Sequence, residues 1–269
     1  MKTLTQLRTL LKANFLWLLL GISLAVGVNG LLESQFENEI LSNIAHKVKD
    51  RTQGLSEEDQ IDSTIALCHY LQARRSEILG GATYHSFKAT NFKSSLQSFY
   101  IGTGACGYYS LFAARVFQKL GYSPRVVQQR VNNRWGGHIT LSLQLKSSGQ
   151  WILVDPLFKH TFRDSQNRLS SLHNVRLNWA TYYAKHTPSN YNPIYNYQQS
   201  WRHTNWDKYG VLSRSVYKIL TFVMGKDRTD ALSLRMWIID AYRVQSILAF
   251  LVSAMCIGLI SFRLKSKTS

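Results

Sequence analysis

Three side chains that could together perform nucleophilic catalysis occur in the order Cys106, His138 and Asp155. Cys106 follows the glycine-containing segment 103–105 and precedes an apolar segment with helical spacing. His138 begins a segment of alternating apolar and polar residues, and Asp155 ends a short hydrophobic one. A thiol, an imidazole and a carboxylate are the components of a catalytic triad. The sequence therefore predicts a cysteine enzyme that transfers or hydrolyses acyl groups.

The expected position of Cys106 at the start of a helix would activate its thiol. The positive end of the helix dipole favours the thiolate, and a neighbouring His138 imidazolium favours it more strongly. Asp155 would accept the second ring N–H of His138 and fix the orientation of the imidazole. The thiolate would attack an amide carbonyl and form a thioester. Water then gives hydrolysis and an amine gives acyl transfer, so both reactions stay open.

The elements that must position these residues follow one another directly in the sequence. Helical spacing of apolar residues extends over 106–120, and Gly121 ends the helix. Strand patterns follow at residues 125–130, 139–146 and 151–155, with turns expected at Gly136-Gly137 and at 147–149. This order predicts an α+β fold in which the Cys106 helix packs on an antiparallel sheet.

These segments resemble the core of the transglutaminase-like superfamily. The resemblance covers about residues 100–158 and is carried by Gly104-Ala105-Cys106, residues 119–127, His138-Ile139-Thr140-Leu141 and residues 151–156, in that order. It implies a papain-like triad with Cys106 as nucleophile, His138 as base and Asp155 as orienting carboxylate, and it implies no cofactor.

Two departures from the animal transglutaminases favour hydrolysis over protein cross-linking. Gly107 stands where those enzymes have Trp, and no dense acidic loop suggests a calcium site. Small membrane-anchored microbial members of the superfamily are expected to be proteases or amidases. The sequence does not identify an oxyanion-hole side chain, for which Trp135, Phe99 and Tyr100 are the candidates.

Two uncharged apolar segments, residues 15–32 and 244–262, approach the roughly 20 residues that a bilayer-spanning helix needs. Basic residues outside both segments place both chain ends on the cytoplasmic side; these are Lys2, Arg8, Lys12, Arg263, Lys265 and Lys267. We therefore expect a bacterial inner-membrane protein with cytoplasmic ends at 1–14 and 263–269 and a periplasmic domain at 33–243. Alternatively, residues 15–32 are a signal peptide cleaved near Val28-Asn29-Gly30.

The charge and the cysteine content restrict the partners and the compartment. The chain has 32 Lys and Arg against 15 Asp and Glu. This excess favours lipid headgroups, an anionic polysaccharide or a cell-wall polymer as surroundings, or simply keeps the surface soluble. No nucleic-acid-binding motif occurs. Cys68 lies on the apolar stripe of a helix expected from Ser56 to about Arg75, which leaves Cys106 as a free thiol.

The segment after Pro156 is rich in Tyr and Trp. These residues either anchor long loops to the domain or line a groove for sugar rings or an extended peptide. Residues 211–224 and 232–242 have amphipathic helical patterns and are expected at the membrane surface, the second continuing into the final apolar segment.

Three functions stay open for the chain. The first is a thiol hydrolase acting on amide or peptide bonds, the second is an acyltransferase with the same triad, and the third is a noncatalytic domain that binds a polymer or a partner. The presence of all three triad residue types favours an enzyme. A zinc site built from the same residues lacks the paired-ligand spacing of such sites.

Overall fold

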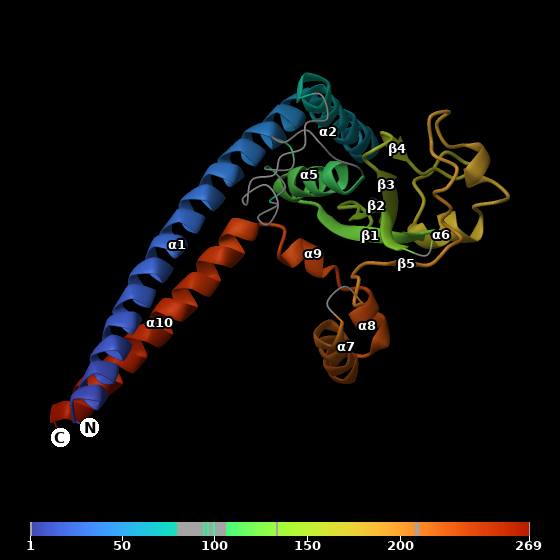
Figure 1. The fold of residues 1–269 in the computed structure, drawn as a ribbon. Coiled ribbons are helices and arrows are strands. Elements are labelled where there is room, and N and C mark those ends of the chain that lie inside the picture. Colours follow the sequence, from blue (N-terminus) through green and yellow to red (C-terminus); the bar gives the residue numbers. More distant parts are fainter. Residues whose placement is uncertain are drawn as a thin grey trace. The chain divides into compact units, whose positions relative to one another are not determined.

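The computed structural model describes residues 2–79, 94, 96, 99, 106–132, 134–207 and 210–268. The segment 103–105 and Tyr100 lie outside the described residues, as do the side chains of the N-terminal basic residues. The chain divides into two units, one formed by Met1–Glu39 with Asp240–Ser269 and the other by Ile40–Ile239 (Figure 1).

The first unit is a pair of antiparallel helices that brings the two chain ends together (Figure 1). It contains the first part of α1 (Lys2–Arg51) and all of α10 (Ala241–Thr268). Residues 14–51 and 241–264 are long and apolar enough to cross a membrane. Only 22% and 17% of their apolar windows are buried, whereas the core helix of a soluble protein is mostly buried. The two predicted apolar segments are therefore helical, and they are candidate membrane spans by length and composition.

Small and polar residues form the contact between these two helices. Ser23 Oγ lies 2.7 Å from Ser253 Oγ, and Ser34 Oγ donates to Asp240 Oδ2 at 2.8 Å. A Cβ atom added to Gly27 would lie 2.8 Å from a ring carbon of Phe250. Close backbone approach at small residues and hydrogen bonds between helices are typical of helix packing in a bilayer.

The second unit contains a five-stranded antiparallel sheet with the strand order β4-β3-β2-β1-β5. The strands are β1 (Ser123–Val131), β2 (Arg134–Gln144), β3 (Trp151–Asp155), β4 (His160–Thr161) and β5 (Trp201–Arg202). The predicted α+β class and the three predicted strands are confirmed. The two short edge strands β4 and β5 were not predicted, because two residues are too few to show a period.

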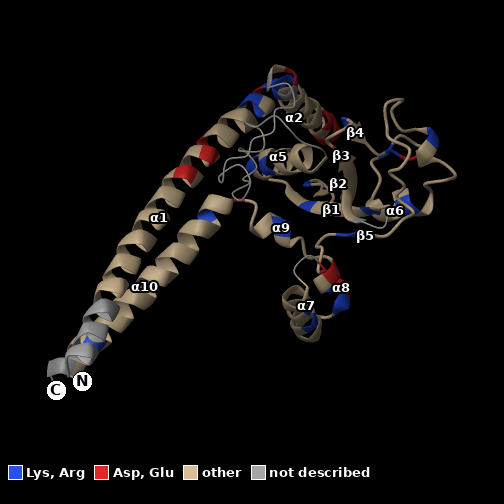
Figure 2. Ribbon diagram, in the orientation of Figure 1, with Lys and Arg blue, Asp and Glu red and all other residues tan. Residues whose placement is uncertain are grey.

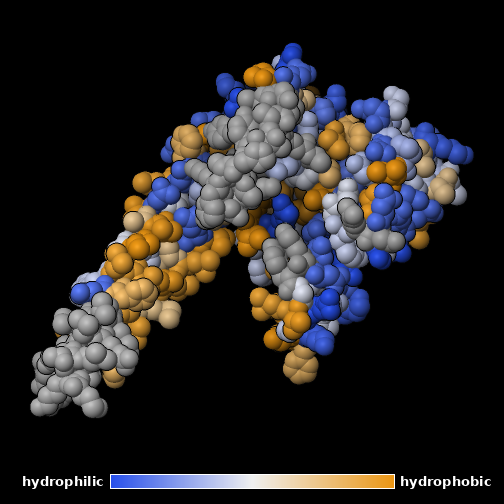
Figure 3. Space-filling model, viewed as in Figure 1, coloured by the Kyte–Doolittle hydropathy of each residue, from blue (hydrophilic) through white to orange (hydrophobic). Residues whose placement is uncertain are grey.

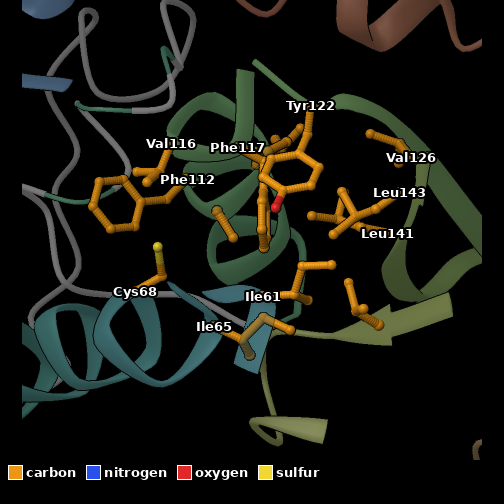
Figure 4. Close-up of a cluster of buried hydrophobic side chains, with 14 of the residues drawn as sticks. Ile61, Ile65, Cys68, Phe112, Val116, Phe117, Tyr122, Val126, Leu141 and Leu143 are labelled. Atoms are coloured by element: carbon orange, nitrogen blue, oxygen red, sulfur yellow. The ribbon is translucent and has the colours of Figure 1, made fainter. Parts of the chain in front are cut away.

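One face of the sheet packs against α2 (Glu57–Leu79) and α5 (Cys106–Lys119) and buries the aliphatic core (Figure 4). Alternate residues of β2, Ile139, Leu141 and Leu143, belong to this core. The predicted N-cap of α2 is confirmed, since Asp59 N donates to Ser56 Oγ at 3.2 Å. Cys68 is buried in the same core, as its place on the apolar stripe predicted.

The other face is covered by the segment 156–207, which includes α6 (Leu172–Leu177) and the 3-10 helix Tyr183–Lys185. Four aromatic residues of this segment are buried with Val127, Leu153 and Phe162 of the sheet region; they are Trp179, Tyr183, Tyr191 and Tyr197. The burial of Tyr183, Tyr191 and Tyr197 fits the interpretation of these aromatics as anchors for long loops, and Trp179 is a further buried anchor.

The hairpin between β1 and β2 differs from the prediction. Gly136 and Gly137 are not a turn, because β2 already begins at Arg134, which pairs with Val131. The register shifts after Gln129, and Gly136 has φ +75° in the irregular region opposite. The predicted alternation at His138 is real, but His138 lies inside the strand rather than at its start.

The predicted helix at 232–242 is also wrong in part. The structure has a short helix, α9 (Leu234–Trp237), and α10 starts only at Ala241. The intervening residues bend, so the amphipathic segment does not continue into the apolar helix. Residues 211–224, in contrast, form the predicted helix α7 (Val211–Met224), which is followed by α8 (Lys226–Asp230).

Candidate active site

Cys106 is the first residue of α5, and this end of the helix lies against β2. Ser110 Oγ donates to the carbonyl oxygen of Ile139 at 2.7 Å. A Cβ atom on Gly107 would lie 3.2 Å from Ile139 Cδ1, so a larger residue would push the helix start away from the strand. The Cys106 side chain is 4% exposed. These contacts hold the thiol beside the strand that carries His138.

His138 and Asp155 meet on the sheet face opposite the aliphatic core. Leu141 pairs with Val154, so His138 and Asp155 project from neighbouring strands to the same side. His138 Nε2 lies 2.6 Å from Asp155 Oδ2, and both side chains are fully buried. A carboxylate can only accept a hydrogen bond, and Nε2 therefore carries a proton.

The buried carboxylate of Asp155 has hydrogen-bond donors at both oxygens. Leu157 N donates to Oδ1 at 3.1 Å, and the Tyr191 hydroxyl donates to Oδ2 at 2.9 Å. A buried charge is costly unless it is paired and hydrogen-bonded, and Asp155 meets both conditions. The carboxylate is thus stabilised in its ionised form at a fixed position against the imidazole.

The environment of His138 favours the imidazolium. Burial by itself disfavours the charged ring, but the charge and hydrogen bond of Asp155, together with the nearby Cys106 thiol, raise its pKa to about 9. The Nδ1 atom is buried and has no hydrogen-bond partner among the described residues. Since Nε2 is bound to Asp155, Nδ1 is the nitrogen available to the Cys106 thiol. The three predicted site residues therefore lie in one connected group.

Two tyrosines that the sequence did not single out complete the surroundings of the imidazole. The Tyr195 ring stacks on His138 with 3.8 Å between centroids and 6° between planes. The Tyr191 hydroxyl, which donates to Asp155, also lies 3.1 Å from the Tyr197 hydroxyl oxygen. The abundance of Tyr after Pro156 was visible in the sequence, but no spacing rule pairs a given Tyr with the triad.

Gln129 is a third residue that sequence reasoning missed. It pairs with His138 across β1 and β2, so the two side chains project to the same face of the sheet. Gln129 is 1% exposed, and neither its Oε1 nor its Nε2 has a hydrogen-bond partner within the part of the chain that the structure describes. An unpartnered buried amide costs about 1–3 kcal/mol, which indicates a ligand atom as its natural partner.

The residues considered for an oxyanion hole lie elsewhere or outside the described residues. Phe99 stacks on Phe112 in the aliphatic core, with 4.8 Å between ring centroids. Trp135 packs beneath the Arg202 guanidinium, which lies 4.0 Å from its ring centroid. Among the described residues, the Gln129 amide and the Thr140 hydroxyl are the buried donors beside the triad that have no hydrogen-bond partner.

Within the described part of the chain, no group of three or more His, Cys, Asp or Glu side chains is arranged to hold a metal ion. No family model, curated protein or solved structure matches this chain. The interpretation of the site therefore depends on its own geometry.

Proposed function

We propose that this chain is a membrane-anchored cysteine hydrolase that cleaves amide or peptide bonds. The single observation that carries the proposal is a fully buried imidazole hydrogen-bonded to a buried carboxylate and placed near a thiol at the start of a helix. Apolar residues of similar volume would fill this place at least as stably, because buried ion pairs contribute little net stability. Catalysis therefore explains the presence of these buried polar side chains, whereas their contribution to stability does not.

The reaction follows from the different positions of the two ring nitrogens of His138, since Nε2 is bound to Asp155 and Nδ1 is available to Cys106. The Cys106 thiolate forms a bond to the amide carbonyl carbon, and the carbonyl π electrons move onto oxygen. His138 then gives a proton to the departing amine as the C–N bond breaks, which leaves a thioester and a neutral imidazole. His138 next takes a proton from water, whose oxygen attacks the thioester carbonyl and releases a carboxylic acid and Cys106. Asp155 holds the ring and stabilises the imidazolium throughout.

Gln129 is the proposed donor to the oxyanion that forms in both attacks. Its amide lies on the side of His138 away from Asp155 and is desolvated without a partner. A donor aimed at developing charge in a water-excluded site is worth more than one in water. The cost of leaving this amide unpaired in the free protein would be recovered when it binds the carbonyl oxygen.

The order of the Cys helix and the His and Asp strands supports membership of the transglutaminase-like superfamily. The apolar helices at both ends support the placement of the reaction outside the cytoplasm, on peptide or protein amides near the envelope. An acyltransferase would use the same thioester and would incorporate an amine in place of water. A noncatalytic polymer-binding domain would need neither the thiol nor the charged imidazole.

The test is the rate of Cys106 alkylation by iodoacetamide as a function of pH. The imidazolium of His138 is present below about pH 9 and disappears above it. We therefore expect the rate in the wild-type chain to be high already at neutral pH. In His138→Ala the rate should be low at neutral pH and rise as the medium becomes alkaline, because no cation stabilises the thiolate.

The Cys106→Ala variant measures the background from the other two cysteines, Cys68 and Cys256, which are 1% and 2% exposed. Burial raises the pKa of the Cys68 thiol far above its usual value, so it stays protonated across the range. Cys106→Ala should abolish the reaction without appreciable loss of stability. Equal pH profiles for wild type and His138→Ala would contradict the proposed function.

A further inference from the structure

Helix α7 carries an apolar face that the rest of the protein leaves uncovered. None of the residues in Val211–Met224 is buried. Leu212, Ile219 and Phe222 have 73%, 62% and 92% of their surface exposed, and Val211 and Val223 are exposed to a similar degree. Helical spacing places these residues on one side of α7, where Figure 3 shows an apolar patch.

The opposite side of α7 is held firmly, so the exposed face has a fixed direction. The Tyr217 hydroxyl donates to Asp230 Oδ1 at 3.0 Å, and its ring lies 5.3 Å from that of Trp206. Ser213 Oγ donates to the Trp206 carbonyl oxygen at 2.6 Å. The helix therefore presents its apolar residues outward from an anchored base.

The charges of α7 are all positive. Arg214 and Lys218 are exposed one turn apart at the border of the apolar face, and α7 contains no Asp or Glu (Figure 2). Arg214 also lies 3.7 Å from Asp207, and its side chain remains 63% exposed. An apolar stripe bordered by cations matches the acyl chains and anionic phosphates of a lipid surface.

A membrane bound by the same chain is the natural partner for this face. Residues 241–264 are apolar enough to cross a bilayer, and two exposed apolar residues, Trp237 and Ile238, immediately precede them. A membrane tethered to the same chain is present at high effective concentration. A second copy of α7 would instead bring Arg214 and Lys218 against the same cations, which repel each other.

We propose that α7 lies in the interfacial layer of an anionic membrane, with Leu212, Ile219 and Phe222 among the acyl chains and Arg214 and Lys218 at lipid phosphates. The contact does not depend on the chemistry at Cys106, and it would hold even if the chain had no enzymatic activity.

The experiment uses the full chain in vesicles of phosphatidylcholine and phosphatidylglycerol. A Cys106→Ala background leaves only the buried Cys68 and Cys256. Phe222→Cys is labelled with an environment-sensitive fluorophore, and the matched control is the same label at Ser165→Cys, an exposed turn residue of the same unit. Quenching is measured with a lipid that carries a nitroxide on its acyl chain and with iodide in the water.

We expect the label at position 222 to be quenched by the acyl-chain nitroxide and shielded from iodide, and the label at 165 to behave in the opposite way. Replacing Arg214 and Lys218 by Gln should reduce the nitroxide quenching severalfold. Equal iodide access at both positions would overturn the proposal. Shielding from iodide without nitroxide quenching would overturn it as well, and would indicate a protein on this face.

Discussion

The two faces of strand β2 differ in what they require from the rest of the molecule. Residues Ile139, Leu141 and Leu143 meet α2 and α5, which need only apolar volume to pack. Residues His138 and Thr140 face the segment that contains Tyr191, Tyr195 and Tyr197, whose rings and hydroxyl groups surround them. Alternate residues of β2 thus belong to the hydrophobic core on one face of the sheet and to the candidate active site on the other.

Most polar groups of this face are paired. Asp155 is bound by His138, Leu157 and Tyr191, and the Tyr183 hydroxyl donates to Ser170 Oγ at 2.6 Å. Among the described residues, the unpartnered atoms of this face are His138 Nδ1, Thr140 Oγ1 and both amide atoms of Gln129. A group of unpaired polar atoms beside the triad marks the place where a substrate atom is expected.

The largest effect is expected from breaking the aliphatic face. Phe117→Ala removes a fully buried ring from the core shown in Figure 4. Loss of packing and the remaining cavity should reduce the free energy of unfolding by about 3–5 kcal/mol. The unfolding midpoint in detergent measures this loss.

The control for Phe117→Ala is the alkylation rate of Cys106 under conditions where the variant is still folded. This rate should match the wild type, because no part of Phe117 takes part in the hydrogen bonds of the triad. A large drop in the rate for folded protein would show that the two faces are not separable.

A smaller effect, on reactivity, is expected from breaking the polar face. Asp155→Asn removes the charge that opposes the burial of His138, and burial then lowers the pKa of the imidazole below its usual value of 6.5. At pH 7 the ring would be neutral, and the alkylation rate of Cys106 should fall about tenfold. The matched control is Asp164→Asn, a carboxylate paired only within its own turn and with Arg168. An unchanged rate in Asp155→Asn would exclude Asp155 as the group that charges His138.

Several structural features that depend on a local sequence pattern were predicted correctly. Alternation identified both faces of β2, helical spacing gave the bounds of α7, and Ser56 marked the start of α2. The bulge near Gly136-Gly137 was mistaken for a turn, because two glycines satisfy either structure equally well. The role of Tyr191 depends on contact between distant segments, and that of Gln129 depends on the exact register of β1 and β2 beside the bulge. No single-sequence pattern encodes either of these.

The smallest change in stability is expected from Gln129→Leu. This variant also distinguishes an oxyanion-binding role of Gln129 from a role in positioning His138. Leucine has a similar volume and no polar atoms, so replacing an unpaired buried amide should leave the free energy of unfolding unchanged or raise it by about 1 kcal/mol. Two reactions of Cys106 then separate the possible roles of the amide. Iodoacetamide alkylates by displacement at a saturated carbon and forms no oxyanion, so its rate should not change.

Acylation of Cys106 by p-nitrophenyl acetate passes through an oxyanion, and its rate should fall about 10²- to 10³-fold in Gln129→Leu. Gln129→Asn keeps the amide but shortens its reach, and should give an intermediate rate. A parallel fall in both reactions would assign Gln129 to the positioning of His138. If neither rate changes while the stability rises, Gln129 has no part in the reaction, and the polar face needs only the triad and its tyrosines.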